Sequence, residues 1–282
     1  MADARKPLHV LNNEWSKCRA CELGARREAV DGNFVFGEGV SRGILFVGEG
    51  PGVSEEEEGR PFVGKSGSLF REVLERLKFQ DYYFTNLVSC RSCEPVIDQA
   101  TGQPVLRKPS RSSKGGVLMK DTVPLPSQIA ACRQRLVEQI YILDPVLIVA
   151  VGSTAAEHLL GKPVSITRER GTFHECSIPG ASFRPVLTDK KQVWGRKVHG
   201  EYVLPTEANE VRYNVLLTLH PSFVLRKGMD KGRDSPLRLF AGDIRLAVKV
   251  YERYIAEVFN REVTSTSDED LSTIGESNED DG

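Results

Sequence analysis

The chain has 282 residues, of which 40% are hydrophobic and 27% charged. This is the composition of an ordinary globular protein, and the length excludes a mini-protein. No uninterrupted apolar run approaches the roughly 18 residues that a membrane-spanning helix needs, which excludes a membrane-embedded protein. The N-terminal residues lack the apolar stretch of a secretory signal, so we expect a cytoplasmic protein.

Charge is distributed unevenly along the chain. Residues 261–282 hold one basic and eight acidic residues, and removing them leaves 37 basic and 31 acidic residues, a net charge of +6 over residues 1–260. A body of that sign attracts a polyanion. We therefore expect one domain over residues 1–260, followed by an acidic, disordered tail. The tail is either a plain solvated terminus or a nucleic-acid mimic that competes for the basic body.

Short apolar runs alternate with segments of helical spacing along the body. The runs are too short for buried helices and rich in β-branched and aromatic residues, which predicts strands at 43–47, 82–88, 146–151 and 214–219. Apolar residues at helical spacing predict helices at 68–77, 127–143, 153–160 and about 235–259. Strands that alternate with helices imply parallel crossovers, so the sequence predicts an α/β fold with a doubly wound parallel sheet.

Two insertions interrupt this alternation, at about 94–122 and 189–211. The first is rich in Gly, Pro, Ser, Lys and Arg, which predicts a long exposed loop. Either it is a solvated excursion, or its basic residues contact the phosphates of a nucleic acid.

Polar and Gly-rich clusters directly follow the predicted strands. They occupy residues 48–52, 86, 152–153 and 220–222. Because ligands of parallel sheets bind at the carboxyl ends of the strands, we expect all four clusters to meet at one rim.

Six cysteines in a reducing compartment favour metal or redox chemistry over disulfides. They form two C-x-x-C pairs, Cys18 with Cys21 and Cys90 with Cys93, and two single residues, Cys132 and Cys176. The two pairs suit a zinc site of four thiolates, but several other quartets would also serve, and scattered buried thiols are the remaining alternative. We expect Cys176 to be an inert core residue.

Three motifs and the N-terminal C-x-x-C carry a family resemblance. The motifs are FVGEGPGVSEEEEGRPFVGKSGSLF at 46–70, TNLVSC at 85–90 and HPSFVLR at 220–226. In this order they resemble the family 4 uracil-DNA glycosylases, and the resemblance runs from about residue 18 to residue 247. It implies a three-layer α/β fold with a central parallel four-stranded sheet, and a four-iron, four-sulfur (4Fe-4S) cluster. It also implies a monomer that hydrolyses the N-glycosidic bond of deoxyuridine in uracil-containing DNA, in base excision repair.

The resemblance also assigns roles to individual residues. The catalytic pair would be Glu49, which holds the water at the reacting sugar, and His220, which lies beside uracil O2. The uracil pocket would be shaped by Gly48, Gly50, Pro51 and Gly52, with Phe62 stacked on the flipped base and Asn86 reading its edge. Leu225 and Arg226 would fill the gap that the flipped base leaves in the duplex.

For the cluster, the resemblance implies the ligands Cys18, Cys21, Cys90 and Cys132, and it leaves Cys93 as a bystander. The chain departs from the family between the third and fourth ligands, where it carries the insertion at 94–122. It also has Ser92 after Arg91, where the family has Pro. Four thiolate ligands imply a structural cluster with no open coordination site.

The chemistry of these residue types is consistent with such roles. A base inside a duplex must rotate out before a hydrolytic water can reach its sugar. An Asn carboxamide offers one donor and one acceptor, which suit uracil N3–H and O4 and fit cytosine poorly. A hydrogen-bond donor at uracil O2 stabilises the negative charge that develops as the base leaves. Each of these residues also has a purely structural alternative as a turn, cap or core residue.

Two other function classes compete with this one. The first is a non-catalytic DNA-binding or repair-scaffold protein that keeps the fold and the cluster. The second is a zinc-containing nucleotide-processing enzyme, which is disfavoured because residues 48–52 lack the Lys and Ser/Thr of a P-loop. We expect the acidic run at 55–58 to be a solvated face or a helix start and not a catalytic group.

Overall fold

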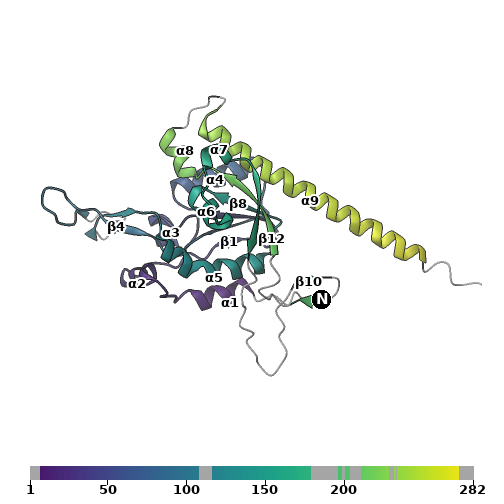
Figure 1. The fold of residues 1–282 in the computed structure, drawn as a ribbon, viewed down its shortest axis with the longest axis horizontal. Helices are drawn as coiled ribbons and strands as arrows, with labels where there is room; N and C mark the ends of the chain where they lie inside the picture. The colour runs from purple at the N-terminus through teal and green to yellow at the C-terminus, as the bar shows by residue number, and fades with distance from the viewer. Residues whose placement is uncertain are drawn as a thin grey trace, which may run out of the picture.

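Helices cover both faces of a six-stranded sheet (Figure 1). The computed structural model describes residues 7–107, 116–178, 196–198, 201–203, 211–228, 232 and 234–272. The sheet has the order β1-β3-β2-β8-β12-β9. Its strands are β1 (Glu38–Gly39), β2 (Ile44–Gly48), β3 (Tyr82–Asn86), β8 (Leu147–Val151), β9 (Phe173–Ile178) and β12 (Val211–Thr218).

Two helices precede the first strand, and the others lie between or after the strands of the sheet. They are α1 (Leu8–Trp15), α2 (Glu22–Ala29), α3 (Val53–Glu58), α4 (Lys65–Arg76), α5 (Pro126–Leu143), α6 (Ser153–Leu160), α7 (Ile166–Glu169), α8 (Pro221–Lys227) and α9 (Pro236–Ser272). Each of the four helices predicted from apolar spacing is present, as α4, α5, α6 and α9.

The four predicted strands form the parallel centre of the sheet, as expected. β3 pairs with β2, β2 with β8, and β8 with β12, all in parallel. The sheet has more strands than the four that were predicted, because β1 pairs with β3 and β9 pairs with β12 as antiparallel edge strands. The two residues of β1 are too few for a periodic signal, and their strand character comes from pairing with β3.

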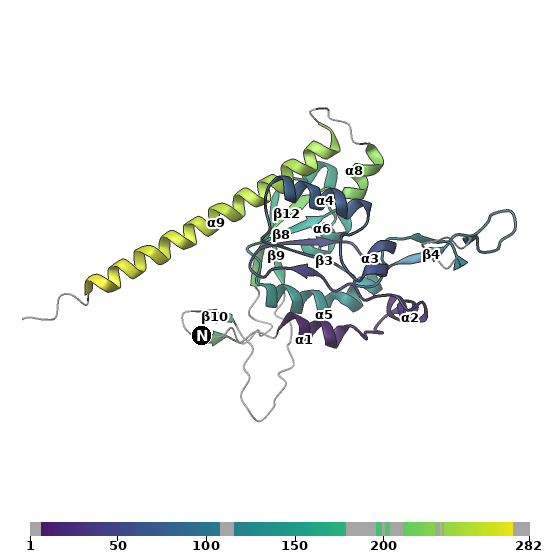
Figure 2. The ribbon, with the colours of Figure 1, turned by 180° about the vertical axis from the view of Figure 1, so that it is seen from behind.

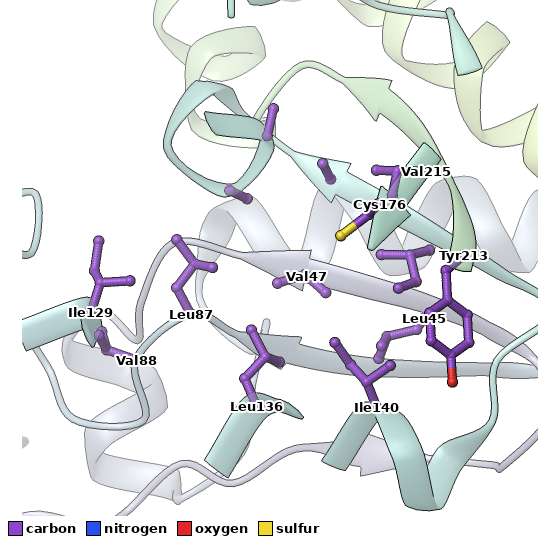
Figure 3. Packing of buried hydrophobic residues seen from close by; sticks show 14 of the residues in the cluster. Leu45, Val47, Leu87, Val88, Ile129, Leu136, Ile140, Cys176, Tyr213 and Val215 are labelled. Carbon is purple, nitrogen blue, oxygen red and sulfur yellow. The ribbon is translucent and has the colours of Figure 1, made fainter. Parts of the chain in front are cut away.

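Alternate residues of the central strands pack on opposite faces of the sheet. Leu45 and Val47 of β2 belong to one apolar cluster, with Leu136 and Ile140 of α5 (Figure 3). The strand neighbours of these two residues belong to a second cluster, which includes Phe70 of α4 and residues of α9. The sheet is therefore the middle of three layers. Its central strands β2 and β8 are buried along their whole length, which explains why they are continuous apolar runs.

The first insertion is not the irregular loop that its composition predicts. In its described part it is a β-ribbon built from β4 (Cys93–Pro95), β5 (Leu106–Arg107), β6 (Gly116–Val117) and β7 (Met119–Asp121). β4 pairs with β7 and β5 with β6, all antiparallel. We call residues 93–121 the arm, and it projects away from the sheet (Figures 1 and 2). Its strands are only two or three residues long, so the Gly, Pro and Ser between them masked the strand signal.

The second insertion and the tail lie largely outside the described residues. Within 189–211, β10 (Arg196–Val198) pairs with β11 (Glu201–Val203) as an antiparallel hairpin. The helix α9 continues to Ser272, so the structure differs from the predicted disorder over residues 261–272. No Gly or Pro interrupts the chain between Gly242 and Ser272, and extending an existing helix costs little per residue. Among the described helices, none combines the length and the apolar character needed to cross a membrane.

Candidate active site and cysteine cluster

A cavity of about 760 Å³ lies at the carboxyl ends of the central strands. The residues that follow β2, β3, β8 and β12 line it together, as the sequence predicts for one rim. They include residues 49–52, 86, 152–154 and 219–220. Helices α3, α4, α6 and α8 all begin at this rim, and residues of their first turns belong to the lining.

The packing of β2 on β3 brings Gly48, Asn86 and Phe62 together. The strand register places Gly48 directly opposite Asn86. A Cβ at Gly48 would collide with Asn86 Oδ1 and would lie 2.8 Å from Phe62 Cζ. Gly48 does not line the cavity itself. Because it has no side chain, it leaves the space that the Asn86 carboxamide and the Phe62 ring occupy. Asn86 is only 4% exposed, and both side chains line the cavity.

Phe62 has an unusual backbone conformation for a residue that is not glycine. Its φ is +53°, a strained region that persists only where the surroundings enforce it. The start of α4 does so, because Gly67 packs so tightly on the Phe62 backbone that a Cβ there would overlap it. The Phe62 ring stacks on Phe84 with the ring centroids 4.7 Å apart. The segment is thus rigid, and the ring is presented to the cavity.

Glu55 joins the two loops that form this wall. Its carboxylate accepts hydrogen bonds from the backbone N–H groups of Gly52 (3.1 Å), Val63 (3.0 Å) and Gly64 (2.8 Å). The sequence prediction of a helix-start charge is right for Glu55, but it missed this tethering role. Its neighbour Glu56 is buried, not solvated, because it forms an ion pair with Arg26 at 2.7 Å.

His220 is the N-cap residue of α8, and its ring is oriented by the helix that it caps. The Ser222 backbone N–H donates to His220 Nδ1 at 3.1 Å, and Ser222 Oγ lies 2.7 Å from the same atom. Burial, together with the nearby Arg226 guanidinium, lowers the pKa of His220 to about 4. The imidazole is therefore neutral near pH 7. Since Nδ1 accepts, the single ring proton lies on Nε2, which makes Nε2–H a donor.

Glu49 lines the same cavity as His220 but comes from a different strand end. Thr154, in the first turn of α6, donates a hydrogen bond from Oγ1 to Glu49 Oε2 at 2.6 Å. Sequence reasoning did not single out Thr154. The one sequence feature that could have indicated Thr154 is its position directly after the polar residues 152–153, which follow β8.

The two residues assigned to the duplex gap lie on α8 and differ in their surroundings. Arg226 is exposed and lines the cavity mouth. Leu225 is partly buried against the apolar cluster on the α4 and α9 side of the sheet, and it is not part of the cavity lining.

Four cysteines from distant parts of the chain lie near one another. Burial raises the pKa of the Cys90 thiol to about 12, and Arg27 opposes that rise. Part of this rise comes from three nearby thiols, those of Cys132, Cys21 and Cys18. A buried thiol of this kind becomes a thiolate only beside a strong positive charge, such as a metal centre.

The remaining two cysteines have other neighbours. Burial raises the pKa of Cys93, and the charged groups that act on it are those of Arg26, Arg91, Glu56 and Asp121. Cys176 is buried on β9, and its thiol lies 2.8 Å from the Leu159 carbonyl oxygen. Among the described residues, no three Cys, His, Asp or Glu side chains converge closely enough to hold one metal ion.

Known proteins are similar to this chain over most of its length. Residues 35–240 match the model of the uracil DNA glycosylase superfamily. The chain is 32% identical to the type-4 uracil-DNA glycosylase of Thermotoga maritima over 231 residues, which cover 78% of this chain and 96% of that protein. It is 29% identical to the type-4 uracil-DNA glycosylase of Pyrobaculum aerophilum over 239 residues, covering 83% and 93%. It is 32% identical to that of Saccharolobus solfataricus over 181 residues, covering 61% and 70%.

Proposed function

This chain belongs to the uracil-DNA glycosylase superfamily, and on that premise we propose that it hydrolyses the N-glycosidic bond of deoxyuridine in DNA and leaves an abasic site. It is a DNA glycosylase of DNA repair, and the relatives reported above are named type-4 uracil-DNA glycosylases. One observation carries the mechanism: Glu49, Asn86 and His220 are far apart in sequence, yet they line a single cavity.

Base recognition uses the wall formed by Phe62 and Asn86. A uracil rotated out of the duplex stacks on the side of the Phe62 ring that borders the cavity, and the Asn86 carboxamide pairs with its N3–H and O4. Gly50, Pro51 and Gly52 complete the pocket. Cytosine would leave the buried amide facing a mismatched donor and acceptor, which is a costly arrangement away from water.

His220 stabilises the leaving group. As the N-glycosidic bond breaks, its electron pair goes to the uracil ring, and negative charge develops on O2. The Nε2–H of neutral His220 donates to that oxygen. Ser222 holds the ring in this tautomer before the substrate arrives, so little reorganisation is needed during the reaction.

Glu49 acts at the sugar, on the other side of the breaking bond. Loss of the base leaves positive charge on the deoxyribose, and a carboxylate at this position stabilises that charge. Glu49 also orients the attacking water and accepts its proton as the new bond to oxygen forms. The hydrogen bond from Thr154 leaves the second carboxylate oxygen for the water.

We assign Leu225 and Arg226 to the gap in the duplex. The exposed Arg226 at the cavity mouth supports this role directly. Leu225 is half-buried, so its insertion into a base stack requires α8 to shift outward.

We further propose that Cys18, Cys21, Cys90 and Cys132 hold a 4Fe-4S cluster. The proximity of three thiols to Cys90 supports this quartet over one with Cys93. In a cluster of this kind each iron would take one of the four thiolates. When bound, the cluster would supply structural cross-linking and no catalytic step. We propose that the protein works in the cytoplasm, as a monomer.

The cluster assignment predicts a difference between two cysteine variants. Anaerobically purified wild-type protein should be brown and contain iron and sulfide. Cys132→Ser should lose the colour and the iron, because one ligand of the quartet is gone. Cys93→Ser is the matched control and should keep both. Colourless wild-type protein with stoichiometric zinc would contradict the assignment.

We propose that the arm contacts the DNA beside the flipped nucleotide. Its base adjoins the cavity, because Ser92 and residues 121–124 belong to the lining. Between Asp98 and Asp121 the sequence contains five basic residues and no acidic one. No residue among 94–106 and 116–123 is buried, so this part of the arm presents its surface to a partner. A two-stranded ribbon of this charge matches the backbone and grooves of a duplex.

Removing basic residues from the arm should therefore weaken binding and leave the chemistry intact. The variant changes Lys108, Arg111 and Lys114, which lie outside the described residues between β5 and β6, to Ser. The slope of log affinity against log salt should fall by about 0.9 for each phosphate that the variant no longer neutralises. The single-turnover rate at saturating enzyme should stay within about twofold of wild type, since the proposed role of these cations is to bind phosphates and not to act on the reacting bond.

The control for the arm variant removes three exposed cations from α9 instead: Arg245, Lys249 and Arg253. The helix α9 extends away from the arm, on the opposite side of the sheet (Figures 1 and 2), so the salt slope of this control should match that of wild type. Equal slopes in the arm and control variants would exclude the arm from DNA binding.

Excision itself is tested with a uracil-containing oligonucleotide, in which product appears as alkali-labile breaks. Wild-type protein should release uracil from the strand, and the same oligonucleotide with thymine in place of uracil should stay intact. Protein that binds the duplex and carries the cluster but releases no uracil would instead be a repair scaffold.

A further inference from the structure

Arg135 of α5 is the largest fully buried side chain in the described part of the protein, with 0% of its surface exposed. Its Nη1 donates to Thr85 Oγ1 (2.9 Å) and to Gln139 Oε1 (2.7 Å). Its Nη2 donates to the backbone carbonyl oxygens of Asn86 (2.6 Å) and Leu87 (3.0 Å). The guanidinium thus joins α5 to the end of β3.

Every one of these four acceptors is uncharged. Within the described residues, the ion pairs of the protein do not include Arg135. Burying a cation without a carboxylate is energetically unfavourable, and an apolar side chain of similar size would avoid that cost. The folded state therefore carries a cation that core packing alone does not require.

The two carbonyl groups that Arg135 binds belong to the base-reading segment. The strand β3 ends at Asn86, so the ladder no longer holds the backbone beyond it. On one side, the N–H groups of Leu87 and Val88 donate to the carbonyls of Gly48 (2.9 Å) and Glu49 (3.3 Å). On the other side, Arg135 holds the carbonyls of Asn86 and Leu87. The segment is clamped from both sides, and the clamp ties it to the motif that carries Glu49.

We propose that Arg135 is a positioning residue for base recognition, whose forked guanidinium fixes the end of β3 so that the Asn86 carboxamide meets the uracil edge. Two charged hydrogen bonds to successive carbonyls restrain a backbone more tightly than neutral ones. Arg135 does not line the cavity and acts only through Asn86. The inference rests on the proposed function and adds a residue that determines its specificity.

A double-mutant cycle tests this dependence. Arg135→Met should lower the single-turnover rate of uracil excision by about 10- to 100-fold, because a small displacement of a reading group is costly in the chemical step. In an Asn86→Ala background, the same change should alter the rate by less than about threefold, since the group that Arg135 positions is already absent. Arg133→Met, at an exposed position of the same helix, is the control. It should leave the excision rate unchanged both in wild-type protein and in the Asn86→Ala background.

Arg135→Lys keeps the charge but loses the fork, so its rate should fall between those of wild type and Arg135→Met. If Arg135→Met does not fold, Arg135→Lys replaces it in the double-mutant cycle with Asn86→Ala. Thermal unfolding of each variant separates the two possible roles. Rate losses that multiply in the double variant and follow the loss of stability would show a purely structural residue and overturn the inference. If wild-type protein excises uracil and the two rate losses are independent, only the role of Arg135 is wrong. If wild-type protein does not excise uracil, the proposed function is wrong as well.

Discussion

His220→Ala should lower the single-turnover rate of uracil excision by about 10²- to 10³-fold, which corresponds to roughly 3 to 4 kcal/mol. The variant removes the Nε2–H donor from the oxygen where negative charge develops. The donor gains strength in the transition state, so binding of the ground-state duplex should change little. The measurement is excision under single-turnover conditions, with enzyme saturating over a uracil-containing duplex.

His158→Ala is the matched control, because His158 is exposed on α6 and does not line the cavity. Its rate should equal that of wild type. A rate for His220→Ala within about threefold of wild type would remove this histidine from the mechanism, since a preorganised donor is worth far more.

The neutral state of His220 also predicts how pH acts on the protein. Burial lowers the pKa of His220 from 6.5 to about 4, so its Nε2–H donor persists across the neutral range. The titration of His220 should therefore leave no step in the excision rate between about pH 8 and pH 5. Below about pH 6.5 the unfolded chain protonates this histidine more readily than the folded protein does. His220 should thus reduce the free energy of unfolding as the pH falls from about 6.5 toward 4, and His220→Ala should weaken that decline.

Asn86→Ala should remove most uracil excision, at least about 10²-fold, while the affinity for duplex DNA stays close to that of wild type. The carboxamide contacts the base only after flipping, and a site built to pair with a polar edge loses selectivity and rate when that pair is gone. Phosphate contacts dominate the binding of the duplex and are untouched. The rate is measured in single turnover, and the affinity by fluorescence anisotropy on the same duplex.

Asn33→Ala serves as the control for Asn86→Ala, because the Asn33 side chain is exposed and donates only to the Glu57 carbonyl at 2.9 Å. It should change neither quantity. If Asn86→Ala lost affinity and activity in equal measure, the residue would support the fold and would not read the base.

The local pattern of the chain was enough to predict the centre of the fold. The strands β2, β3, β8 and β12 are continuous apolar runs because both of their faces are buried, and burial of this kind is visible in sequence. The convergence of the residues after these strands also followed from the pattern, since parallel strands share one carboxyl edge. The motifs around Glu49, Asn86 and His220 predicted which residues would line the cavity, and their catalytic roles stay predictions.

Only the tertiary structure decided how those residues are held. Arg135 lies 49 positions from Asn86, and Thr154 lies 105 positions from Glu49, so no local period signals either contact. The composition of residues 94–122 predicted a loop, because strands as short as those of the arm gain their character from pairing and not from propensity. The tautomer of His220 likewise depends on the start of α8, whose Ser222 N–H is turned toward Nδ1. Sequence patterns record which face of an element is buried, whereas hydrogen bonds between distant elements and pKa values depend on the three-dimensional surroundings of single atoms.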